Sequence, residues 1–79
     1  MKLKKNIATS EAGFIFNPGT GDSFSVNAIG AEIISMLKEN KTYQEIFEDI
    51  TSRYEVEKNQ IERDMDDFVS LLTEYNLLD

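Results

Sequence analysis

The chain has 79 residues, of which 41% are hydrophobic and 10% aromatic, and it contains neither Cys nor His. This length suits one compact domain spanning residues 1–79, near the lower size limit for folding without disulfides or metal ions. The missing residue types exclude disulfides, thiolate nucleophiles, zinc sites with Cys or His ligands and the usual acid–base group of neutral pH. We therefore expect no metal and no cofactor.

The net charge of −7 is distributed unevenly. The first 31 residues carry three basic and two acidic groups, whereas residues 32–79 carry five basic and thirteen acidic groups. Because such an acidic surface repels phosphate, nucleic acid is not an expected partner. No apolar stretch approaches the ~20 residues of a membrane span, and no segment has the pattern of a signal peptide. We expect a cytoplasmic protein with no membrane partner.

Three short segments at the start of the chain have the composition of strands. Residues 2–8 alternate in polarity, residues 12–18 (AGFIFNP) are rich in aromatic and β-branched side chains, and residues 22–26 (DSFSV) alternate again. Between the second and third segments, Pro18 has a fixed φ and Gly19 is free to take a positive φ, as a tight turn requires. The pattern predicts an antiparallel meander whose first and third strands are edges.

Three helices are predicted after the strands. Asn27 is placed to cap the first helix, which runs to about Glu39. Gly30 costs this helix about 1 kcal/mol relative to Ala, which indicates a close approach of the helix to the sheet. Thr42 and Glu45 form a capping box at the start of the second helix. The third helix has about five turns, and its apolar stripe consists of Ile61, Met65, Phe68, Leu72 and Tyr75.

Two motifs resemble sites for chemistry but have simpler interpretations. In the run DMDD (residues 64–67), Asp64 and Asp66 lie about 200° apart on a helix, and no glycine bends the segment into a calcium loop. The run GTG (residues 19–21) lacks the spacing, the Lys and the helix start of a phosphate loop. A solvated acidic face and a hairpin turn explain them. Because no catalytic residues are identified, we do not expect an enzyme.

The order of a small sheet and three helices is also that of a winged helix, in which the third helix would contact DNA. Five of the eight exposed positions from Glu57 to Asp67 are acidic, which is the charge that phosphate repels. These charges argue against DNA binding by the third helix. A winged-helix transcriptional regulator or protein-interaction module is kept as the alternative function.

The third strand is the candidate binding element. Lysines at positions 2, 4 and 5 protect the first strand against edge pairing, whereas the third strand has two small serines. An open edge accepts an extended peptide by strand addition, although a helix covering this edge is an equally valid interpretation. The flank of the third helix that would line the cleft is left open. The candidate peptide-binding residues are Ser23, Phe24, Ser25, Val26, Met65, Val69 and Leu71.

An ordered set of short motifs spans residues 14–78: Val26-Asn27, Gly30-Ala31, Thr42, Glu45-Ile46, Tyr54, Val56, Asp64-Met65, Phe68-Val69 and Leu77-Leu78. In this order and spacing they resemble the PqqD family of peptide chaperones, also called recognition elements of ribosomally made, post-translationally modified peptides (RiPPs). Val26 replaces the usual Leu, Ile34 stands where an aromatic is common, and Asn76 replaces the usual Gly.

The resemblance implies an α+β, winged-helix-like fold with a three-stranded antiparallel sheet followed by three helices. It also implies a non-catalytic function in peptide modification. The leader of a precursor peptide would bind as a fourth strand along the third strand, against the third helix, and be presented to a modifying enzyme (maturase). The short chain fits the free-standing members of the family. Both a monomer and a dimer are compatible with an open edge.

Overall fold

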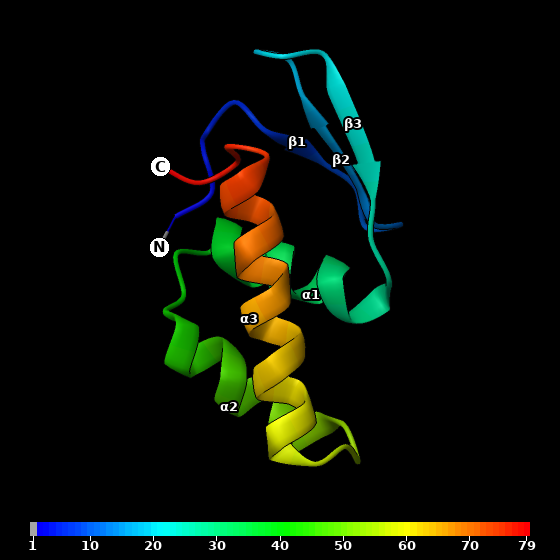
Figure 1. Ribbon diagram of the computed structural model, residues 1–79, viewed down its shortest axis with the longest axis vertical. Helices are drawn as coiled ribbons and strands as arrows, with labels where there is room; N and C mark the ends of the chain where they lie inside the picture. The colour runs from blue at the N-terminus through cyan, green and yellow to red at the C-terminus, as the bar shows by residue number, and fades with distance from the viewer. Residues whose placement is uncertain (1) are drawn as a thin grey trace.

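The computed structural model describes residues 2–79 as a small sheet followed by three helices (Figure 1). The elements are β1 (Ala8–Thr9), β2 (Phe14–Asn17), β3 (Asp22–Ser25), α1 (Ala28–Lys38), α2 (Tyr43–Arg53) and α3 (Lys58–Glu74). The molecule measures 36 × 21 × 20 Å, with the sheet at one end and α3 running from the opposite end up to it. This arrangement confirms the α+β, winged-helix-like fold predicted from the sequence.

The sheet is an antiparallel meander in the order β1–β2–β3, so β3 is an edge strand, as predicted. The turn before β3 differs in detail from the expectation, because the positive φ falls at Gly21 (80°) and not at Gly19. Asn17 accounts for this difference. Its side-chain oxygen accepts a hydrogen bond from the Gly19 N–H at 2.9 Å, and its carbonyl accepts one from Gly21 at 2.8 Å. The reversal is therefore completed two residues later than expected.

The predicted first strand over residues 2–8 is wrong, since β1 covers two residues only. Leu3 instead forms an isolated bridge with Leu78, and the chain then turns, with the N–H of Ile7 donating to the carbonyl of Lys4 at 3.2 Å. Leu3 and Ile7 are both buried. They face the core because the chain turns between them, and not because they lie on one face of a pleated strand. Lys2 and Lys4 consequently lie beside the C-terminal segment, where the Lys4 N–H donates to the carbonyl of Leu77 at 2.9 Å and the Lys2 carbonyl accepts from the Asp79 N–H at 2.8 Å. These two lysines therefore do not protect an edge of β1.

The junction between β3 and α1 is set by Asn27, whose side-chain oxygen accepts a hydrogen bond from the Gly30 N–H at 2.8 Å. This confirms the predicted N-cap. Gly30 is buried, and a Cβ atom there would lie 3.0 Å from the Cβ of Val26. The predicted close approach at Gly30 is thus made by Val26, the residue that follows β3. This contact holds the end of the strand against the first turn of α1.

The capping box of Thr42 and Glu45 is present at the start of α2, as predicted.

The hydrophobic core lies where the helices meet each other and the inner face of the sheet. Full burial of an aliphatic side chain stabilises a fold by about 1.5–3 kcal/mol, so the core dominates the stability of so short a chain. Its buried members are Leu3, Ile7, Ile15, Ile33, Ile34, Met36, Leu37, Ile46, Ile50, Ile61, Met65, Leu72 and Leu77.

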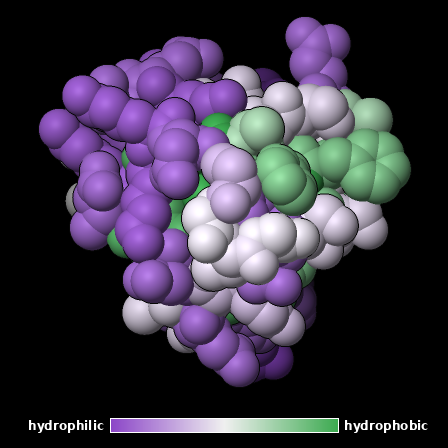
Figure 2. Space-filling model, turned by 90° about the horizontal axis from the view of Figure 1, so that it is seen from above, coloured by the Kyte–Doolittle hydropathy of each residue, from purple (hydrophilic) through white to green (hydrophobic). Residues whose placement is uncertain are grey.

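The outer face of the sheet is partly apolar. Phe14 and Phe16 of β2 are 61% and 44% exposed. They pair with Ser25 and Ser23 of β3, which are also exposed. Figure 2, which views the sheet end of the molecule, shows apolar side chains gathered on one side and hydrophilic ones on the other. Within residues 2–79, no helix is long and apolar enough to cross a membrane.

Candidate functional site

The free edge of β3 carries unpaired backbone groups. The N–H of Val26 donates to the carbonyl of Gly13 at 2.8 Å, and Phe24 lies opposite Ile15. In an antiparallel ladder the residues alternate between facing the partner strand and facing away from it. The N–H and C=O groups of Phe24 therefore point to β2. Those of Ser23 and Ser25 point to the open side.

The side chains of β3 fix the strand against α3. Phe24 and Val26 are half-buried and pack against the core, as predicted, while Ser23 and Ser25 are exposed. The ring of Phe24 lies 4.4 Å from that of Tyr75, just after α3, with 52° between the ring planes. An aromatic pair of this kind contributes about 0.5–1.5 kcal/mol beyond its buried area. The open edge is thus held beside the C-terminal end of α3.

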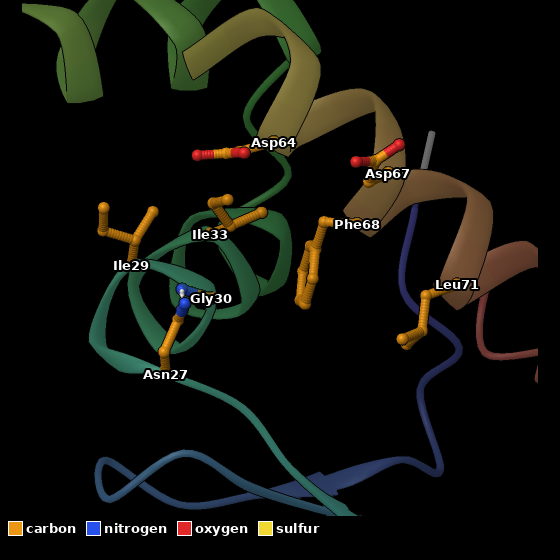
Figure 3. A pocket seen from close by; sticks show the side chains of 8 residues that line it. All are labelled: Asn27, Ile29, Gly30, Ile33, Asp64, Asp67, Phe68 and Leu71. Carbon is orange, nitrogen blue, oxygen red and sulfur yellow. Dashed lines mark hydrogen bonds between the residues drawn. The ribbon is translucent and has the colours of Figure 1, made fainter. Parts of the chain in front are cut away.

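A groove of about 320 Å³ continues from this edge, between the start of α1 and one flank of α3. Figure 3 shows Phe68 and Leu71 projecting from α3 on the same side, with Asp64 above Ile29 and Ile33 of α1. Leu71 is 37% exposed and Phe68 is half-buried, so both offer apolar surface to a ligand. The residues that line the groove are Asn27, Ile29, Gly30, Ile33, Asp64, Asp67, Phe68 and Leu71.

The groove has a negatively charged wall. Asp64 and Asp67 are exposed on α3, and Asp64 accepts a hydrogen bond from the neutral side chain of Gln60 at 2.9 Å. Residues 2–79 form two ion pairs, and Arg53 makes both of them, with Glu32 and with Asp49. The two aspartates of the groove therefore keep their charge uncompensated by an ion pair in the part of the chain that is described.

Of the candidate residues on α3, the structure places Leu71 alone in the groove. Met65 is 1% exposed and belongs to the core, so its side chain offers no surface to a peptide. Val69 is half-buried and lies about 160° from Leu71 around the helix axis, on the opposite flank. Sequence reasoning missed Phe68 and Ile29. The spacing of residues 64, 67, 68 and 71 along one helix flank was the signal that could have found the α3 wall.

The other polar contacts between helices lie away from the groove. Hydrogen bonds from Arg53 and Tyr54 lower the pKa of Glu32 and join α2 to α1. Burial and a 2.8 Å hydrogen bond to Asp66 raise the pKa of Tyr43 to about 12, which joins α2 to α3. No group of three or more acidic residues among residues 2–79 is arranged to hold a metal ion. The arrangement of edge and groove supports binding of an extended ligand.

Comparison with known families assigns the chain. The model for coenzyme PQQ synthesis protein D (PqqD) matches residues 13–78, which is nearly the whole sequence. The chain belongs to the PqqD family. No curated protein matches it. For this PqqD-family chain, the matched span includes β2, the β3 edge and both walls of the groove.

Two solved structures are similar to the chain over almost its entire length. One is TbiB1 in complex with the TbiA(beta) leader peptide, at 30% identity and a TM-score of 0.90, covering 100% of this chain and 95% of that one. The other is lasso peptide synthetase B1 complexed with the leader peptide, at 26% identity and a TM-score of 0.80, covering 98% and 93%. Both of these similar proteins are thus seen with a leader peptide bound.

Proposed function

We propose that this chain is a non-catalytic peptide chaperone of the PqqD family. It binds the leader of a ribosomally made precursor peptide as a fourth strand along β3 and presents that peptide to a modifying enzyme. The observation that carries the proposal is the open backbone edge at Ser23 and Ser25, continuous with the apolar groove between α1 and α3. The two similar structures that hold leader peptides support it.

Strand addition divides recognition between backbone and side chains. The outward N–H and C=O groups of Ser23 and Ser25 match the backbone of any extended peptide. Leu71 and Phe68 then accept apolar side chains from the part of the peptide that runs past the strand. Backbone pairing supplies affinity, and the groove supplies register.

The groove has the composition of a binding surface and not of a reaction centre. Its polar side chains are two exposed aspartates and Asn27, whose side-chain oxygen already caps α1. The groups with shifted pKa values, such as Tyr43 and Glu32, instead join helices to one another. Any covalent step on the precursor is therefore assigned to the partner enzyme.

The test is an NMR titration of ¹⁵N-labelled protein with synthetic leader peptides encoded near its gene. We expect shift changes at Ser23–Val26 and at Phe68 and Leu71, and slower amide exchange at Ser23 and Ser25. A duplex DNA of mixed sequence serves as the comparison ligand. Unchanged signals along β3 with every leader would refute the proposal. Salt-dependent DNA binding through α3 would instead favour the winged-helix regulator.

A further inference from the structure

We propose that the leader segment in the groove carries an apolar side chain and, at a short fixed spacing further from β3, a Lys or Arg. The apolar side chain packs on Phe68 and Leu71, and the cation pairs with Asp67 or Asp64. This inference rests on the proposed function and specifies which leaders the site selects. It derives from the order of apolar and charged groups along one flank of α3.

The apolar part of the groove lies next to the sheet. Leu71 is one turn from Tyr75, which contacts Phe24 of β3. Phe68 follows, and Ile29 and Ile33 form the facing wall on α1. A peptide that leaves the β3 edge therefore meets apolar surface first. An aliphatic or aromatic side chain is the complementary group at this point.

The charged part lies further from the sheet. Asp67 and Asp64 follow Phe68 toward the start of α3, and both are exposed. The facing wall opposite Asp64 consists of the apolar side chains of Ile29 and Ile33 on α1. A peptide cation is attracted to the two aspartates, and the α1 lining of the groove contains no charged side chain that would repel it. A peptide carboxylate at this point would face two like charges.

Helix and strand geometry give the spacing. Along α3, at about 1.5 Å per residue, Asp67 lies about 6 Å from Leu71, and Asp64 lies about 10 Å from it. In an extended peptide, side chains on the same face recur every two residues, or about 6.6 Å. The basic residue is thus two positions from the apolar anchor if it pairs with Asp67. If it pairs with Asp64, it is four positions away, about 13 Å along the peptide, and its long side chain spans the remaining ~3 Å.

The test compares matched neutralisations on α3. Asp64→Asn and Asp67→Asn keep the side-chain shape and remove the charge, and the amide introduced at position 64 retains an oxygen that accepts from Gln60. Glu62→Gln removes the same charge at a position outside the groove. The probe is the synthetic leader encoded near the gene, together with variants in which each Lys or Arg is replaced in turn by norleucine. Affinities are measured by calorimetry at low and at high salt.

We expect the double Asp64→Asn and Asp67→Asn variant to bind the leader about three- to tenfold more weakly at low salt, and Glu62→Gln less than twofold. The loss should disappear for the one leader variant in which norleucine has replaced the basic residue that faces the groove. If the leader protects Ser23 and Ser25 but the aspartate variants bind it normally, the inference is wrong and the proposed function stands. If no leader protects these amides, both are wrong.

Discussion

Replacing Ser25 by Pro tests strand addition at a single backbone group. The N–H of Ser25 points away from β2, so its removal leaves the ladder between β2 and β3 intact, and proline is tolerated on an edge strand in this orientation. A lost hydrogen bond is worth about 1 kcal/mol, and the peptide carbonyl left without a donor costs about 1 kcal/mol more. A total of about 2 kcal/mol corresponds to a roughly 30-fold weaker affinity for the leader.

Ser25→Ala is the matched control, since it removes the hydroxyl but keeps the N–H. We expect it to bind the leader within about twofold of the wild-type protein, and we expect both variants to show similar melting curves by circular dichroism. Affinity is measured by fluorescence anisotropy of a labelled leader. Equal binding by Ser25→Pro and Ser25→Ala, with both folded, would show that β3 does not pair with the peptide and would refute the reasoning.

Neighbouring leucines separate binding from stability: Leu72→Ala should lower the free energy of unfolding by about 2–5 kcal/mol, because Leu72 is 0% exposed. Leu71→Ala should lower it by about 1 kcal/mol or less but weaken leader binding severalfold, as urea unfolding and anisotropy will report. Thr42→Ala should cost about 1 kcal/mol through loss of the capping box, measured by urea unfolding. Tyr43 has a folded-state pKa of about 12, above its unfolded value near 10. The contribution of Tyr43 to the free energy of unfolding is therefore complete below pH 10 and is lost as the pH rises to 12. In urea unfolding curves recorded over this pH range, Tyr43→Phe should lack this loss of stability.

Local signals in the sequence located most of the elements correctly. Asn27 before an apolar repeat and Thr42 three residues before Glu45 mark helix starts through hydrogen bonds made within four residues. Such interactions depend on nearby residues only, so the sequence contains all the information needed to predict them. The edge position of β3 followed in the same way from three short segments joined by turns.

The N-terminal segment was mispredicted because its partner is distant in the sequence. Leu3 bridges Leu78, and this contact brings together the two ends of the chain. Alternation of polarity over residues 2–8 is compatible with a strand, but it does not report that a turn between Lys4 and Ile7 redirects the segment. Long-range pairing of this kind is invisible to a local pattern.

The wall of the groove depends on how α3 is rotated about its axis, and that rotation is set by packing. Met65 was a candidate because it lies in the middle of the apolar stripe, yet a residue in the middle of a stripe faces the core. Surface for a ligand comes from the border of the stripe, where Phe68 is half-buried and Leu71 is 37% exposed. The border next to β3 becomes known once Tyr75 is seen to contact Phe24.

The short link of Val26 and Asn27 between β3 and α1 explains why edge and groove form one site. Since Asn27 caps α1 two residues after the end of β3, a peptide paired with Ser25 continues without a gap between α1 and α3. The edge contributes backbone hydrogen bonds, which are nearly independent of peptide sequence, whereas the groove distinguishes side chains. Under the proposed function, affinity and selectivity therefore reside in different residues. A change at Ser25 should scale the affinities of all leaders together, whereas a change at Leu71 should alter their ranking.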